Sequence, residues 1–389
     1  MEDRFQDTPV NNLLQGSPLR RILSMQQKYR IVGIPRRLVR RRSLVWSVWT
    51  LIALVLVTVV EAVDPGRMNR LSGSITDAAS EEPLPHCNVF LANTTMGCVT
   101  DLNGKFSLRE IPDGRYQLVA NRVGYHRYVI DIELPADSDR TWVIRLQQKP
   151  IEVGEVTVTA TVPRQWQAQL SRFKKAFLGE TRNASHCLID NPEVLRFESD
   201  ALQSQLIAYC DSTLHITNRA LGYHLDIVLD SFHWGGLEGF YQIYPRFEPL
   251  IPESAREAEQ WQENRARTWR GSFRHFITAL ARGRAEQEGF EIYLRDLEQN
   301  GRSMGERTFS QSIVEESAGR AVKMRFNGLL EVRFHSDEIS MIRLKQNFVL
   351  IGDTGEVYPP LSVVLFGHWA KQRIADTLPL DFDGMALQH

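Results

Sequence analysis

Short segments that alternate apolar and polar residues follow one another between residues 70 and 148, and this period of two is typical of β-strands. Turn-forming groups such as Asp101-Leu-Asn-Gly104 and Pro112-Asp-Gly114 separate them. The predicted strands are residues 71–76, 88–91, 97–100, 105–108, 115–120, 128–134 and 141–146. This rhythm predicts a seven-stranded Greek-key β-sandwich. The predicted core positions are Phe106, Leu108, Tyr116, Leu118, Ile130, Ile132, Val143 and Leu146.

After residue 163 the pattern becomes mixed. Apolar residues three or four positions apart predict a helix over residues 165–177 and one long helix over residues 254–281. Further strands are predicted at residues 206–210, 214–218, 223–229, 290–294, 321–326, 329–334, 341–344, 348–351 and 363–365. We therefore expect a β-rich α+β protein. In it a linker strand (149–163) joins the sandwich (70–148) to a mixed α+β domain (164–389) with one long helix.

The segment before the sandwich has a different character. Residues 43–60 form an uncharged apolar run of 18 residues, close to the ~20 that a membrane-spanning helix needs. Residues 1–42 carry ten Lys or Arg and three acidic residues, a net charge of +7 that leaves −8 for the remainder of a chain whose total is −1. Positive residues prefer the cytoplasmic side, so residues 1–43 are predicted as a cytoplasmic tail and 44–62 as a transmembrane helix.

A signal peptide explains the same segment equally well. Small residues around Val60-Glu61-Ala62 suit cleavage, and a start at Met25 instead of Met1 would give a leader of ordinary length. The sequence leaves both readings open: an inner-membrane anchor with the later domains outside the cytoplasm, or a released periplasmic or outer-membrane protein. Because the basic block flanks an apolar run, we expect a membrane rather than a nucleic acid as its partner.

Four cysteines lie on the expected exported side, where disulfides persist: Cys87, Cys98, Cys187 and Cys210. None forms a C-x-x-C pair, so a cysteine-based zinc site is not expected. Cys87 and Cys98 fall in adjacent predicted strands and are candidates for a disulfide. Buried free thiols are the alternative for all four.

The motifs of the first domain resemble a known family. They include Gly73-Ser-Ile-Thr-Asp77, Thr100-Asp101-Leu-Asn-Gly104-Lys-Phe106, Gly114-Arg-Tyr116 and Gly124-Tyr125. In this spacing they resemble the carboxypeptidase-like regulatory domain. The resemblance implies a transthyretin-like sandwich that accompanies other domains and performs no chemistry itself. The following segment, residues 151–160, resembles the connector after this sandwich in TonB-dependent receptors. The remaining chain is too short for a receptor barrel.

The second domain also resembles a family. Asn191-Pro-Glu-Val-Leu195, Leu221-Gly-Tyr223, Gly271-Ser-x-Arg-His-Phe276 and Trp369-Ala-x-x-Arg373-Ile-Ala-Asp-x-Leu-Pro379 match a signature of exported bacterial proteins that carry this sandwich. That resemblance implies an architecture, but it assigns no enzymatic reaction to the domain. An accessory role in a TonB-dependent transport system is a further reading of the connector.

Residues 164–389 contain no standard catalytic motif. There is no H-E-x-x-H, no G-x-S-x-G and no glycine-rich phosphate loop. One His335-Ser-Asp-Glu338 pattern exists, with His368 as a potential third zinc ligand, but it reads better as a hairpin turn. We therefore expect no catalytic residue, no metal and no cofactor. A metallopeptidase-like hydrolase remains the alternative.

Polar residues gather on the predicted long helix, at Asn264, Arg265, Arg270, Arg274 and His275. Of these, Asn264, Arg265, Arg274 and His275 form a candidate ligand cluster, with a structural role inside the domain as the favoured alternative. Trp234, Tyr241, Tyr244 and Phe247 form either a stacking loop or a hairpin that packs on the core. The resulting hypothesis is a non-enzymatic envelope protein that binds a glycan, a peptide or another envelope protein.

Overall fold

The computed structural model describes residues 68–138, 140–149, 164–199, 205–210, 212–235, 239–295, 305–315, 321–335 and 338–384. The predicted tail (1–43), the predicted apolar segment (44–62) and all but the first residue of the linker strand (149–163) lie outside these ranges. Inside the ranges, no helix combines the length and the apolar character that a membrane crossing requires.

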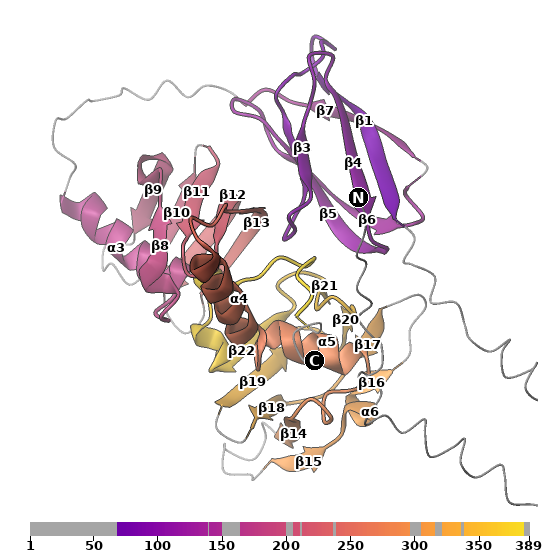
Figure 1. Ribbon diagram of the computed structural model, residues 1–389, viewed down its shortest axis with the longest axis vertical. Coiled ribbons are helices and arrows are strands. Elements are labelled where there is room, and N and C mark those ends of the chain that lie inside the picture. Colours follow the sequence, from indigo (N-terminus) through magenta and orange to yellow (C-terminus); the bar gives the residue numbers. More distant parts are fainter. Residues whose placement is uncertain are drawn as a thin grey trace, which may run out of the picture. The chain divides into compact units, whose positions relative to one another are not determined.

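Seven strands form the first domain, as the sequence pattern predicts, and they pair in two sheets (Figure 1). One sheet has the order β4-β1-β7 and the other β3-β2-β5-β6. β1 runs parallel to β7 and antiparallel to β4. The strands are β1 (Asn69–Asp77), β2 (Asn88–Leu91), β3 (Gly97–Val99), β4 (Lys105–Ile111), β5 (Gly114–Asn121), β6 (Tyr128–Leu134) and β7 (Thr141–Leu146).

The core of this sandwich follows the predicted alternation with one error. In β7, Trp142, Ile144 and Leu146 are buried, whereas Val143 is 63% exposed. The prediction placed Val143 and Leu146 on the same face. That is wrong, because residues three apart in a strand point to opposite faces. The large Trp142 side chain takes the inward position instead.

The region after residue 163 begins with helix α3 (Arg164–Leu178) and a six-stranded sheet. The sheet order is β8-β11-β12-β10-β9, and β13 pairs with β12. Phe173 and Phe177 of α3 pack against Phe232 of β12, at ring-centroid distances of 4.8 and 6.0 Å. Helix α3 therefore covers one face of the sheet. The strands are β8 (Cys187–Ile189), β9 (Leu195–Ser199), β10 (Gln205–Cys210), β11 (Leu214–Asn218), β12 (Tyr223–Gly235) and β13 (Phe240–Pro249).

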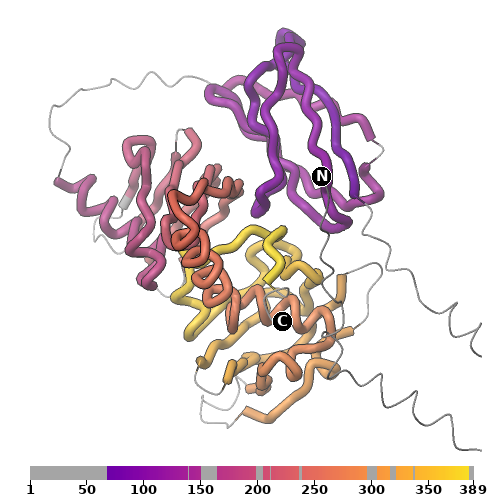
Figure 2. The backbone as a smooth tube through the Cα atoms, viewed as in Figure 1, coloured from indigo at the N-terminus to yellow at the C-terminus, as the bar shows by residue number. Residues whose placement is uncertain are grey.

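The predicted long helix is two helices, α4 (Ala255–Trp269) and α5 (Phe273–Ala281), and Figure 2 follows the chain through the break. Gly271 adopts a left-handed conformation (φ +69°), which ends the first helix. Ser272 then starts the second, because its hydroxyl accepts the backbone N–H of His275 at 3.1 Å. The apolar period continues across the break, so periodicity alone could not reveal it.

The last part of the chain forms two smaller sheets around a separate core. The orders are β15-β14-β18-β19-β22 and β16-β17-β20-β21. Phe276, Ile277 and Leu280 of α5 are buried against them. The region predicted as a single domain thus contains two hydrophobic cores. The elements are β14 (Phe290–Arg295), β15 (Glu306–Thr308), α6 (Ser310–Ile313), β16 (Val314–Glu315), β17 (Val322–Met324), β18 (Leu329–Phe334), β19 (Glu338–Leu344), β20 (Val349–Ile351), β21 (Val357–Tyr358) and β22 (Val363–Gly367).

The sandwich is bound to the region that follows it by backbone hydrogen bonds. Asn93 N–H donates to the carbonyl of Pro245 at 2.7 Å, and Phe247 N–H donates to the carbonyl of Thr94 at 2.9 Å. A small apolar cluster lies beside these bonds, with Phe90 and Val119 from the sandwich and Tyr244 from β13. The loop after β2 therefore behaves like an added strand next to β13.

Cys87 and Cys98 are free thiols in the structure, so the predicted disulfide between them is not formed. The strand register explains this, because Cys98 lies opposite Val89. Cys87 exchanges hydrogen bonds with Thr100 instead, accepting its N–H at 3.0 Å. The two cysteines are therefore two residues apart in the register of β2 and β3. Burial raises the pKa of both thiols.

Candidate functional site

A cavity of about 420 Å³ lies between the sandwich and the region that follows it. One wall comes from β5, a second from β13, and a third from the junction of α4 and α5. The segment from residue 355 to residue 380 contributes a fourth wall. This volume lies in the range of small-ligand sites, which are mostly apolar clefts with a few polar groups.

Aromatic rings make up much of the wall. They are Tyr116, Tyr241, Tyr244, Trp269, Phe273, Tyr358 and Trp369. Several are held by their own polar atoms: the Tyr116 hydroxyl donates to the Pro112 carbonyl at 3.2 Å, and Trp369 Nε1 donates to the Gly271 carbonyl at 2.7 Å. Burial raises the pKa of Tyr116 and Tyr358, which keeps both phenols protonated.

Charges of both signs stand among these rings, on Arg115, Arg274, Glu356, Arg373 and Asp376. Arg373 lies over the Trp234 ring at 4.7 Å. Asp376 accepts hydrogen bonds from Thr181 and Asn183, each at 2.9 Å. Burial nevertheless raises the pKa of Asp376 above its ordinary value, because desolvation outweighs those bonds. The wall can therefore offer both donors and acceptors to a ligand.

Arg274, one of the predicted cluster residues, is half-buried and bridges separate segments of the chain. Its guanidinium donates to five carbonyl groups: Nε to Thr354 at 2.8 Å, and the terminal nitrogens to Leu378, Pro379, Leu380 and Phe382. Burial lowers its pKa to about 10. One face of this side chain reaches the cavity wall. Its main contacts hold the C-terminal segment against α5.

His275 points the other way, into the core. It is 1% exposed and lies between the rings of Phe290 and Phe334. Its Nδ1 accepts the Gly271 N–H at 3.0 Å, and its Nε2 lies 2.9 Å from Glu288 Oε2. Burial lowers the pKa of His275. It therefore tethers the helix break and does not face the cavity.

Asn264 and Arg265 bind a third place, the turn between β11 and β12. Asn264 Nδ2 donates to the Ala220 carbonyl at 2.8 Å, and Arg265 Nε donates to the Leu221 carbonyl at 2.7 Å. Arg265 also lies over the Tyr223 ring at 4.2 Å. The four predicted cluster residues thus serve three separate contacts and do not converge on one ligand.

The aromatic run at Trp234, Tyr241, Tyr244 and Phe247 belongs to the β12–β13 hairpin. Tyr244 and Phe247 are buried, and Tyr241 stacks near Phe232 at 6.3 Å. This is the hairpin alternative rather than a separate stacking loop. Tyr241 and Tyr244 nevertheless contribute to the cavity wall.

The potential zinc ligands His335, Glu338 and His368 do not form a metal-binding group. His368 Nε2 lies 3.7 Å from Glu338 Oε2, but His335 packs on the Phe334 ring at 4.2 Å. A grouping with ligand atoms all within 4.8 Å of one another does exist among the described residues, at His215, His224 and Asp226. The sequence interpretation did not single these three out, although they fall on the polar face of two predicted strands.

The cavity itself was also missed. Tyr116 was predicted as a core residue, and Trp369, Arg373 and Asp376 were noticed only as part of a resemblance. Their separation along the chain hides the site, since the β5 and C-terminal walls lie more than 200 residues apart. No local spacing signal could have joined them.

The fold and the site define a protein with a β-sandwich module joined to an α+β region by a shared cavity. Residues 71–158 match the family model of the CarboxypepD_reg-like domain. This confirms the carboxypeptidase-like regulatory domain predicted from the motifs of that stretch. The match ends before α3, so it identifies the sandwich and leaves the following region outside the family.

Comparison with curated protein sequences finds no match. Among solved structures, a chain of a type II cohesin–X-dockerin complex from Acetivibrio cellulolyticus aligns at 19% identity, covering 29% of this chain and 76% of that chain, with a TM-score of 0.19. A 9R-lipoxygenase from Cyanothece aligns at 12% identity over 61% of this chain and 51% of that chain, with a TM-score of 0.15. Both TM-scores are too low to support an argument.

Proposed function

We propose that this chain is a non-enzymatic binding protein of the cell envelope, and that its cavity binds a short peptide segment. The observation that carries the proposal is the aromatic cavity of about 420 Å³, whose walls come from both the sandwich and the α+β region. A regulatory sandwich that supplies one wall of a ligand site can transmit the presence of that ligand to its neighbour.

The chemistry of the wall favours a peptide over a sugar. The rings of Tyr116, Tyr358 and Trp369 offer an apolar surface that suits one aliphatic or aromatic side chain. Arg115 and Asp376, with opposite charges, can bind the carbonyl and N–H groups on either side of that chain. A glycan could stack on the same rings, and the disaccharide in the experiment below tests it.

The envelope location rests on the charge asymmetry around residues 44–62. Under this proposal the segment holds the binding domains outside the cytoplasm. N-terminal sequencing of the chain in the membrane fraction tests it. An intact N-terminus supports the anchor, and a mature chain that begins at Val63 would replace the anchor with a cleaved leader.

Peptide binding is tested by titrating the full chain with tripeptides whose central residue is Phe, Leu or Ser, while tryptophan fluorescence is recorded. Trp269 and Trp369 line the cavity and should report occupancy. We expect the Phe tripeptide to bind at least tenfold more tightly than the Ser tripeptide, about 1.4 kcal/mol, because its ring leaves water.

Tyr358→Ala removes a half-buried ring from the wall and should weaken the Phe tripeptide about tenfold. Tyr209→Ala is the matched control, since this tyrosine is 41% exposed on β10 and lies away from the cavity. Equal effects of both variants would exclude the cavity as the site. A disaccharide that binds where the peptides do not would change the ligand class, and cleavage of the peptide, seen by mass spectrometry, would contradict a non-enzymatic role.

A further inference from the structure

The face of the six-stranded sheet that lies opposite α3 carries a compact group of imidazoles and carboxylates. His215 of β11 lies directly opposite Asp226 of β12, and His224 lies two residues earlier on the same strand. The neighbouring positions Leu214, Ile216 and Leu225 are buried in the opposite face. Because side chains alternate along a strand, both histidines and Asp226 must project on the outer side of the sheet.

The ligand atoms of this group are close enough together for one ion, and His215 and Asp226 are hydrogen-bonded to each other. His215 Nδ1 lies 2.7 Å from Asp226 Oδ1, and His224 Nε2 lies 3.4 Å from the same oxygen. All three ligand atoms lie within 4.8 Å of one another. Zinc bonds of about 2.0–2.2 Å place neighbouring ligand atoms roughly 3.4 Å apart in a tetrahedron. A small rotation of the Asp226 carboxylate therefore makes room for an ion.

The second ring nitrogen of His224 faces a carboxylate, that of Asp190. His224 Nδ1 lies 3.7 Å from Asp190 Oδ2, and Thr217 Oγ1 donates to that carboxylate oxygen at 2.8 Å. A histidine that binds a metal usually directs its other ring nitrogen toward a carboxylate, which orients the ring and makes it a stronger ligand. The arrangement Thr217–Asp190–His224 has this form, and its members come from β11, from the end of β8 and from β12.

We propose that His215 Nδ1, His224 Nε2 and Asp226 bind a divalent transition metal ion, zinc foremost. Two imidazoles with one carboxylate suit zinc and similar ions rather than magnesium or calcium, which prefer oxygen ligands. Three protein ligands leave a fourth position for water, and the His215 side chain is 41% exposed, so solvent reaches the site.

Nearby charges support cation binding. His224 faces Glu248 across the strand pair, and Asp226 faces Arg246, both on β13. When the histidines are neutral, the group contains three carboxylates, on Asp190, Asp226 and Glu248. The guanidinium of Arg246 is the positive charge opposite them. This excess of negative charge favours a bound cation.

The test is equilibrium dialysis of the full chain against zinc chloride at pH 7.5, with cobalt absorption spectroscopy as a second readout. We expect one ion per chain and a rise in melting temperature with zinc. Bound cobalt should give visible absorption bands typical of a site with a low number of nitrogen and oxygen ligands. His215→Ala and His224→Ala should each lower zinc affinity at least a hundredfold. Asp190→Ala should lower it about tenfold, because it orients a ligand without touching the ion.

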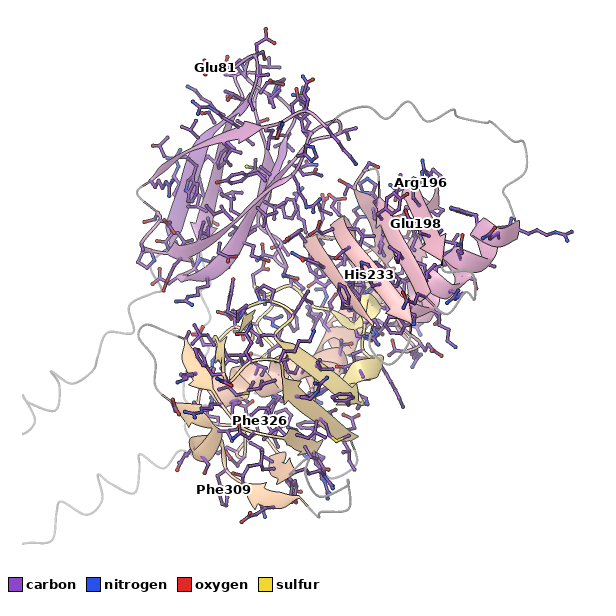
Figure 3. All side chains as sticks on the ribbon, turned by 180° about the vertical axis from the view of Figure 1, so that it is seen from behind. Glu81, Arg196, Glu198, His233, Phe309 and Phe326 are labelled. Atoms are coloured by element: carbon purple, nitrogen blue, oxygen red, sulfur yellow. The ribbon has the colours of Figure 1, made fainter. Side chains whose placement is uncertain are left out.

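His233→Ala is the matched control, since this histidine lies on β12 near the other end of the same sheet (Figure 3). It stacks on Phe240 at 4.7 Å and should leave zinc binding unchanged. Melting temperatures without metal show whether each variant is folded. Zinc binding that survives the double change His215→Ala/His224→Ala, or that is lost with His335→Ala instead, would overturn the proposal. So would a wild-type chain that binds no zinc, which would leave a hydrogen-bonded sheet contact only.

Discussion

The sandwich and the region after it use buried polar groups in different ways. In the sandwich the interior is almost wholly apolar, and its buried carboxylate, Asp77, serves a turn: it accepts the N–H groups of Ala79 and Ser80 at 2.7 and 2.9 Å. The later region instead buries His275 and Asn218 fully and Arg274 partly. Asn218, for example, donates to the carbonyl of Ala375, 157 residues away.

The difference shows what each region depends on. A sandwich core needs only alternating apolar and polar residues and good packing, so the residue pattern of each strand determines which of its side chains are buried. The later region has two cores that must be joined. The side chain of Arg274 donates to four carbonyl groups of the C-terminal segment and to the Thr354 carbonyl between β20 and β21. A polar side chain can thus act as the link between elements that periodicity cannot connect.

Removal of that link should have the largest effect on stability. Arg274→Met keeps much of the volume of the side chain but removes its hydrogen bonds to five carbonyl groups, so we expect a loss of about 4 kcal/mol in the free energy of unfolding. Arg325→Met is the control, because Arg325 is 59% exposed and should change stability by less than about 0.5 kcal/mol. Urea unfolding measures both. Similar values for the two would remove the distinction between the regions.

A slightly smaller effect is expected from the apolar core of the sandwich. Leu118 is fully buried, and Leu118→Ala should cost about 3 kcal/mol through lost burial and a cavity. Val143→Ala, at an exposed position of the same domain, should be nearly neutral. If the Leu118 variant destabilised the chain far more than the Arg274 variant, the polar contacts of Arg274 would matter less than the comparison suggests.

The smallest effect concerns acid stability. The N–H groups of Ser80 and Ala79, with the Tyr125 hydroxyl and Gln148, lower the pKa of Asp77 to about 2. A carboxyl with a lowered folded pKa contributes stability that is complete above its unfolded pKa near 3.9 and is lost as the pH falls toward 2. Asp77→Asn should therefore flatten the fall of the urea midpoint between pH 4 and pH 2. An unchanged slope would show that other carboxylates dominate there.

The sequence predicts the candidate sites to unequal degrees. His215 and His224 alternate with apolar residues, so their shared face could be read from the sequence, but their closeness depends on the register of β11 and β12. The cavity could not be read at all, because Tyr116 and Trp369 meet only after the sandwich docks on β13. The candidate cluster Asn264, Arg265, Arg274 and His275 shows the converse. These residues are neighbours on the predicted long helix, but the break at Gly271 places the first two on α4 and the last two on α5.

The sequence alone determined the seven strands of the sandwich, its regulatory-domain class and most strands of the later region, because those depend on local alternation and turn residues. Only the tertiary structure decided that the long helix breaks, that two cores share the later region and that Cys87 and Cys98 stay apart. It also decided where the cavity and the His215–His224–Asp226 group form. Each of these depends on register or on contacts between distant segments, which local patterns do not encode.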